Sequence, residues 1–212
     1  MIFKLRGWEA AKTRGARETL STEFGINGGS ELNSILHFHV VNGLPPDPFH
    51  DILEGCLKTS DHKLLRQYVI VEKIMTLATL NEKLHGFDYG YSETRPTTIL
   101  EAHLGEGSSL HQTGSQLWSL ATILPLLFEP LVEADDKYWL NYVCLLRIVS
   151  LVYARETSLG EVGLLEGLIE DYLAGFQELY RNFIPKQHFL LHYPYQILMW
   201  GPLGTYDTMR ME

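Results

Sequence analysis

Hydrophobic side chains recur every three or four positions along most of this chain, the spacing that places them on one face of an α-helix. The segments with this period are residues 8–20, 61–84, 115–128, 136–154, 161–181 and 188–200. Breaks rich in glycine, proline and polar residues separate most of them, as turns require. We expect Asp61 to cap the long second segment and Pro125 to kink or shorten the third. The pattern therefore predicts a mainly α fold.

A different pattern lies between the first two of these segments. Polar and apolar residues alternate over residues 37–41, which predicts a short strand or extended segment. Asp47 followed by Pro48 then predicts the start of a helix, because an aspartate can accept hydrogen bonds from free backbone N–H groups and proline has none to leave unpaired. His50 and Asp51 fall in the first turn of that helix. The sequence thus gathers polar groups at a helix N-terminus.

Composition adds a size and a compartment to this picture. A chain of 212 residues with 45% hydrophobic content can bury a substantial core. Cys56 and Cys144 each fall in an apolar helical pattern and form neither a metal-knuckle spacing nor a disulfide framework. No apolar run reaches the roughly 18 to 20 residues of a membrane span, since Arg147 interrupts the best candidate, residues 139–154. We expect an intracellular protein without a secretory signal.

Charge is distributed unevenly along the chain. The net charge of -9 argues against the body as a nucleic-acid binder, because phosphate contacts need clustered Lys and Arg. Residues 1–17, however, contain five basic residues and only Glu9 to oppose them, giving +4 and leaving -13 for the rest. These basic residues are Lys4, Arg6, Lys12, Arg14 and Arg17. We expect a basic arm and helix over residues 1–29, either a solvated surface or a weak DNA contact, before a helical domain over residues 30–212.

Several histidines could take part in metal chemistry. His188 and His192 are four residues apart, as a zinc-binding pair on a helix would be, but no glutamate general base lies between them. A packed or hydrogen-bonded pair is therefore favoured. A second arrangement resembles the ligand set of the all-helical HD phosphohydrolases. Its candidates are the adjacent His50 and Asp51, with His37 or His39 and a distant Asp135 or Asp171.

Three segments of the chain, taken in order, point to one protein family. Leu32–Gly55 resembles the region of CACTA (En/Spm-like) transposases that carries an Asp-x-x-His signature, here Asp47 and His50. Gly114–Leu127 resembles the family's helical insertion. Residues 186–194, 201–203 and 209–212 resemble the block that contains the family's last acidic residue. The order of these segments matches the family from Leu32 to Glu212.

The resemblance implies a piece of an RNase H-like transposase that cleaves and joins DNA strands in the nucleus. In such an active site three carboxylates hold two divalent metals, Mg²⁺ or Mn²⁺, which activate the attacking oxygen and stabilise the leaving one. Glu212 would be the third acid, and hence a catalytic metal ligand. Asp47, His50 and Asp51 would belong to the signature near that site. The expected fold is the helical insertion, with remnants of the catalytic fold at its edges.

The sequence also departs from the family pattern. No aspartate precedes Asp47, so the first two acids of the triad are missing, together with the cysteine-rich segment expected after them. We therefore expect a fragment that neither holds two metals nor cuts DNA by itself, and that exposes apolar surface normally covered by the catalytic fold. The other interpretation from this family is a domesticated, non-catalytic helical module that binds protein or DNA.

Overall fold

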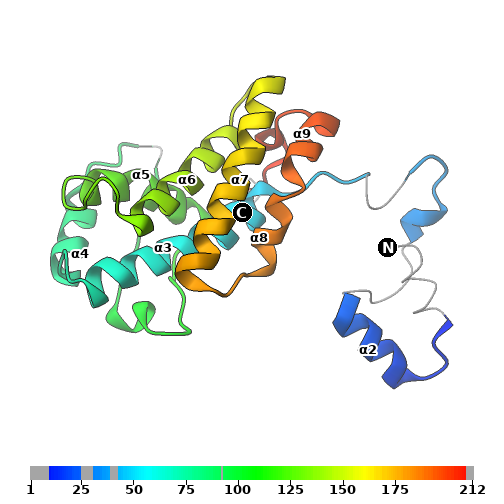
Figure 1. Cartoon of the computed structure of the whole chain (residues 1–212), viewed down its shortest axis with the longest axis horizontal. Helices are drawn as coiled ribbons and strands as arrows, with labels where there is room; N and C mark the ends of the chain where they lie inside the picture. Colours follow the sequence, from blue (N-terminus) through cyan, green and yellow to red (C-terminus); the bar gives the residue numbers. More distant parts are fainter. Residues whose placement is uncertain (1–9, 25–30, 39–42, 92, 209–212) are drawn as a thin grey trace. The chain divides into compact units, whose positions relative to one another are not determined.

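The computed structural model describes residues 10–24, 31–38, 43–91 and 93–208 (Figure 1). The chain forms two compact units, Met1–Pro45 and Pro46–Glu212. Every regular element among the described residues is a helix or a helical turn, and none of these residues forms a strand. The predicted mainly α fold is therefore confirmed. No helix in the described part of the chain is long and apolar enough to span a membrane.

The first unit contains the helix α2, Arg14–Phe24, and a short 3₁₀ turn, η1, Glu31–Ser34. Of the helix predicted over residues 8–20, residues 14–20 belong to α2, residues 11–13 interrupt the helical conformation of Ala10, and residues 8 and 9 lie outside the described residues. The reason is local: the Thr13 hydroxyl accepts the N–H of Ala16 at 3.2 Å, which starts the helix there. The extended segment predicted over residues 37–41 lies mostly outside the described residues. Its first residue, His37, lies in a turn with φ 68°.

The second unit begins with one continuous helical run that changes its hydrogen-bonding pattern twice. A π-helix, η2, Phe49–Leu57, continues into the α-helix α3, Lys58–Leu65, and then into a second π-helix, η3, Arg66–Val71. The helix start predicted at Asp61 is therefore wrong. Asp61 lies inside α3 and is 0% exposed, and its carboxylate accepts a hydrogen bond from the Tyr142 hydroxyl at 2.8 Å instead of capping backbone N–H groups.

The helix predicted over residues 61–84 is divided by a sharp break. The N–H of Ile74 reaches back to the carbonyl of Tyr68 at 2.8 Å, and Lys73 between them has φ 57°. A new helix, α4, Leu77–Gly86, then starts where the Thr76 side chain accepts the N–H of Thr79 at 3.1 Å. The apolar period continues across this break, and for that reason the pattern indicated a single helix.

Three long helices follow, close to their predicted bounds. They are α5, Gly114–Phe128, α6, Lys137–Val152, and α7, Leu159–Tyr180. Their N-caps are Thr113, Asp136 and Ser158, and each side chain accepts a backbone N–H of the first turn, which stabilises a helix start. Pro125 lies in the last turn of α5, which continues for three residues beyond it. Helix α6 packs along α7.

The C-terminal part of the unit consists of shorter elements. The apolar segment predicted as one helix over residues 188–200 forms two, α8, Pro185–Leu190, and α9, Tyr193–Trp200. Pro194 lies in the first turn of α9, where its missing N–H costs nothing. Two 3₁₀ turns, η4, Glu101–Leu104, and η5, Leu203–Tyr206, complete the described elements.

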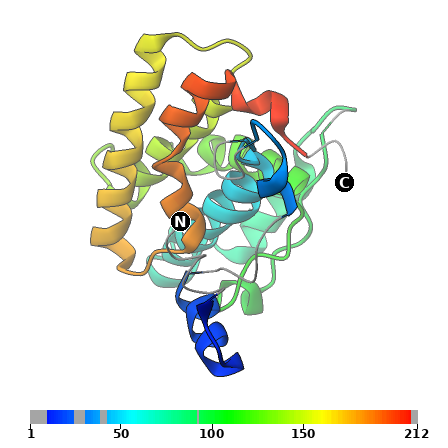
Figure 2. The ribbon, with the colours of Figure 1, turned by 90° about the vertical axis from the view of Figure 1, so that its right-hand side faces the viewer.

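The continuous run from Phe49 to Val71 lies in the middle of the second unit (Figure 2). Its η2 part contacts α5 and α8, and its α3 part contacts α6. The core side chains of the run that are at most 2% exposed are Phe49, Ile52, Leu53, Cys56, Leu57, Leu64, Leu65 and Tyr68. At Gly114 there is no room for a Cβ atom, because the Phe49 ring occupies that space. The N-terminus of η2 therefore packs directly against the start of α5.

Candidate functional site

The predicted helix start at Asp47 is confirmed and forms the centre of a polar cluster. The Asp47 carbonyl accepts the N–H of Asp51 at 3.1 Å, and its carboxylate accepts the N–H of Phe49 at 3.1 Å. Pro48 follows with φ -60°, the value that suits a first helical turn. The carboxylate is therefore fixed in the first turn by the backbone that follows it.

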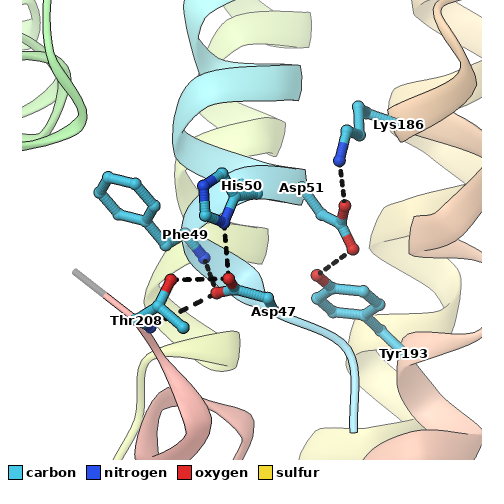
Figure 3. A network of polar contacts seen from close by, with 7 residues as sticks. All are labelled: Asp47, Phe49, His50, Asp51, Lys186, Tyr193 and Thr208. Carbon is cyan, nitrogen blue, oxygen red and sulfur yellow. Dashed lines mark hydrogen bonds and ion pairs between the residues drawn. The ribbon is translucent and has the colours of Figure 1, made fainter. Parts of the chain in front are cut away.

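Two further groups bind the same carboxylate (Figure 3). His50 Nδ1 lies 2.6 Å from Asp47 Oδ2, and the Thr208 hydroxyl donates to Oδ2 at 2.7 Å. The Thr208 N–H also donates to Oδ1, at 3.4 Å. Burial opposes ionisation, but the hydrogen bonds from Thr208, His50 and Phe49 outweigh it and lower the pKa of Asp47. We call these three side chains, Asp47, His50 and Thr208, the clasp.

The clasp joins residues that are far apart in the sequence. Asp47 and Thr208 are separated by 161 positions, so they lie at the two ends of the described part of the second unit. A carboxylate 2.6 Å from His50 Nδ1 orients the imidazole ring. The clasp therefore holds His50 in a fixed orientation. It also ties the C-terminal segment to the start of η2.

A partly buried tyrosine, Tyr153, interacts electrostatically with Asp47 of the clasp. Tyr153 caps the C-terminus of α6, and burial together with the charges of Asp207 and Asp47 raises the pKa of its hydroxyl. This hydroxyl therefore stays protonated at neutral pH. A Cβ atom at Gly204 would come within 3.2 Å of the Tyr153 Cα, so η5 packs closely on the end of α6. Thr208, two residues after the end of η5, follows this contact.

Asp51 has a separate set of partners, although it follows His50 directly. Its carboxylate accepts from Lys186 Nζ at 2.8 Å and from the Tyr193 hydroxyl at 3.4 Å (Figure 3). Asp51 is 8% exposed, and burial and the Asp51 charge together raise the pKa of Tyr193. The pair ties η2 to α8, which approaches so closely that a Cβ atom at Gly55 would lie 2.8 Å from that of Lys186. Asp51 thus stabilises the fold beside the clasp.

The structure therefore brings together Asp47 and His50 of the predicted signature and directs Asp51 elsewhere. Glu212, the predicted third acid and metal ligand, lies outside the described residues. Sequence reasoning missed Thr208 and Lys186 as partners of the two aspartates. Lys186 lies in a segment that the transposase resemblance had singled out, which was the one available signal for it.

Within the second unit, the two distant carboxylates of the phosphohydrolase hypothesis, Asp135 and Asp171, lie in different places. Asp171 lines a groove between α6 and α7, and Asp135 lines a different cavity beside Glu72 and Asp136. His37 is exposed in the first unit, and His39 lies outside the described residues. Within the described ranges, no group of three or more His, Cys, Asp or Glu side chains could hold a metal ion.

The histidine pair near the C-terminus is divided by the break between α8 and α9. His188 lies in α8, whereas His192 is the N-cap of α9, so the two are not on one helix face as predicted. Their rings meet edge to face, with centroids 5.2 Å apart. This arrangement fits the packed pair that the sequence favoured.

Of the five basic residues of the predicted arm, Lys4 and Arg6 lie outside the described residues. Lys12, Arg14 and Arg17 are exposed. Arg14 Nε donates to Glu18 at 2.7 Å and Arg17 Nε donates to the Ala11 carbonyl at 3.0 Å. Such exposed contacts are weak and can be exchanged for others.

Comparisons with protein-family models, with curated proteins and with solved structures gave no match to this chain. The resemblance to CACTA transposases accordingly rests on the three sequence segments themselves.

Proposed function

We propose that the second unit is the helical insertion of a transposon-derived, CACTA-type DNA transposase, and that DNA strand cleavage and transfer belong to the intact parent. The observation that carries this proposal is the hydrogen bond between Thr208 and Asp47. A domain inserted into another fold needs its incoming and outgoing chain segments side by side. The clasp provides this arrangement at the position where the resemblance places the catalytic fold.

An exposed apolar helix face also supports an insertion. Tyr195, Leu198 and Met199 are each between 52% and 57% exposed, and their spacing places them on one side of α9. Contiguous apolar surface of this kind is commonly covered by another protein or domain. In the intact parent, the RNase H-like catalytic fold would cover it.

The described residues of the clasp do not form a two-metal site. The Asp47 carboxylate already accepts from His50 and Thr208, and Asp51 accepts from Lys186. In the intact parent, Mg²⁺ or Mn²⁺ would need carboxylates from outside the described part of this chain, with Glu212 as one of them. The proposed role of Asp47 and His50 is to hold the segment that leads to this acid.

The DNA contact proposed for the basic arm can be tested directly in solution. The family resemblance implies that this contact occurs in the nucleus. We expect fluorescence anisotropy to show weak, salt-sensitive binding to a short DNA duplex. If all five basic residues contact phosphates, raising the salt fourfold should weaken binding up to roughly 500-fold. A variant with Lys4, Arg6, Lys12, Arg14 and Arg17 changed to Gln should lose this binding.

A matched control removes the same amount of charge from the second unit. Five of its exposed basic residues are Lys73, Lys83, Arg95, Arg147 and Arg155, and their replacement by Gln should leave DNA binding nearly unchanged. Equal losses in both variants would mean that only net charge matters, and no binding at all would leave the arm without a DNA role.

Activity assays separate this proposal from its rivals. We expect no nicking of supercoiled plasmid with Mg²⁺ or Mn²⁺. Nicking that disappears in Glu212→Gln would show an active core in this chain and contradict the incomplete-core proposal. Hydrolysis of a nucleotide with Mn²⁺ that disappears in His50→Ala would favour the HD phosphohydrolase instead.

A further inference from the structure

A second polar site lies away from the clasp. A cavity of about 230 Å³ opens between the α3–η3 part of the central run and the end of α7. Its lining includes His62, Lys63 and Arg66 from the run, Glu106 from the loop after η4, and Tyr180 from α7. Three basic side chains of one helical segment therefore face the same small space, with a single carboxylate opposite them.

The two cationic side chains of this cavity, Lys63 and Arg66, make only weak interactions with other protein groups. Arg66 lies 3.9 Å from Glu106, whose side chain is 96% exposed, and an ion pair of that length and exposure contributes little. Lys63 Nζ lies over the Tyr180 ring, 5.7 Å from its centroid. An incoming anion could therefore displace Glu106 at small cost and meet both cations.

His62 adds an unusual feature to the same lining. It is 6% exposed, and its buried Nε2 has no hydrogen-bond partner among the described residues. A buried polar atom left without a partner is costly. Burial lowers the pKa of His62, a hydrogen bond with the Gly105 backbone opposes this, and the charges of Lys63 and Arg66 lower it further. A bound negative charge would oppose the effect of Lys63 and Arg66 and raise the pKa of His62.

We propose that this cavity binds a phosphate group through Lys63 and Arg66, with His62 beside them. A guanidinium matches two phosphate oxygens at once, and an ammonium adds a compact charge. The volume suits one phosphate carried by a small molecule or by a nucleic-acid backbone. This site is independent of the transposase proposal, because none of its lining residues belongs to the clasp or to the basic arm.

The test is a titration with inorganic phosphate at constant ionic strength, followed by the imidazole NMR signals of His62. We expect a saturable shift and a higher His62 pKa in phosphate than in chloride. Arg66→Gln and Lys63→Gln should each weaken binding roughly tenfold or more, as losing one charge-assisted hydrogen bond does. Lys83→Gln, which removes an exposed charge from α4, should leave binding unchanged.

A variant that is expected to bind phosphate more tightly provides a control, because misfolding cannot increase affinity. Glu106→Gln removes the competing carboxylate from an exposed position, and it should tighten phosphate binding. No saturable shift in the wild-type chain, or the same affinity in all four variants, would overturn the proposal. Competition then identifies the source: displacement by a single-stranded oligonucleotide indicates a nucleic-acid phosphate, and displacement by a small phosphate monoester alone indicates a metabolite.

Discussion

At the scale of single residues, Asp61 shows most clearly how environment changes chemistry. It is 0% exposed, and only one of its carboxylate oxygens has a partner among the described residues, the Tyr142 hydroxyl. Burial raises the pKa of Asp61 to about 8, although the hydrogen bond from Tyr142 opposes this. The acid is therefore protonated in the folded chain at neutral pH.

This raised pKa makes stability depend on pH in a defined window. Unfolded aspartate releases its proton near pH 4, whereas folded Asp61 keeps it up to about pH 8. Between these values the folded state binds more protons, so the free energy of unfolding falls as pH rises, by up to about 1.4 kcal/mol per pH unit. Asp61→Asn should flatten that fall, as measured by urea unfolding from pH 5 to 8. Asp171→Asn, an exposed change in α7, should retain the wild-type slope.

The contrast between Asp47 and Asp61 explains what the sequence could predict about single residues. Asp47 follows two prolines and precedes a third, so local geometry alone fixes it as a helix start. Asp61 has no such neighbours, and its partner Tyr142 lies 81 positions away. A local pattern identified the first correctly, and could not distinguish a cap from a buried acid for the second.

At the scale of elements, helix starts were predicted better than helix breaks. Thr113, Asp136 and Ser158 carry the capping signal in their own side chains. The break at Lys73 has no glycine or proline between residues 66 and 76 to announce it. The chain turns there through Lys73 in the left-handed conformation, and the Ile74 N–H reaches back to the Tyr68 carbonyl, a local turn of the kind that usually carries glycine. The π-helical pattern of η2 and η3 likewise has no signal in the apolar period.

The pairing of α6 with α7 can be tested by one substitution at two glycines of α7. Gly167 has nothing within 4 Å of a built Cβ atom, whereas a Cβ atom at Gly175 would lie 2.6 Å from Asn141 Nδ2. Asn141 is buried and donates to the Tyr172 carbonyl at 2.8 Å, so it can move only by losing that bond. Gly167→Ala should stabilise the protein by about 0.5–1 kcal/mol. Gly175→Ala should destabilise it by about 1–2 kcal/mol.

Thermal or urea unfolding of both variants checks the opposite signs. The two residues share one helix, so propensity alone would stabilise both variants equally. A stabilising Gly175→Ala would show that α6 and α7 do not approach as closely as described.

At the scale of the whole molecule, the clasp closes the second unit between its ends. The sequence identified one side of it, Asp47 and His50, because both lie within a single helical turn. It could not identify Thr208, since nothing in a local pattern relates residues 161 positions apart. The same reason hid the pairing of Asp51 with Lys186, 135 positions away. Long-range polar partners were thus the part of the candidate site that only the fold could reveal.

A double-mutant cycle measures whether the clasp contributes to closing the unit. Asp47→Ala and Thr208→Val, singly and together, should show a coupling of about 1–2 kcal/mol in the free energy of unfolding. Thr205→Val is the matched control, because the Thr205 hydroxyl donates locally to the Pro202 carbonyl at 2.8 Å. Its coupling to Asp47→Ala should be smaller than about 0.5 kcal/mol.

The pH dependence of that coupling tests its electrostatic origin. The pKa of Asp47 is lowered in the folded chain, so the stabilisation is present above the ordinary carboxyl pKa near 4 and is lost as pH falls through the folded value. The coupling with Thr208 should therefore be constant between about pH 5 and 7 and decrease in stronger acid. If the Thr208 and Thr205 cycles instead give equal couplings at neutral pH, the clasp does not hold the two ends together, and the proposal of an inserted domain loses its principal support.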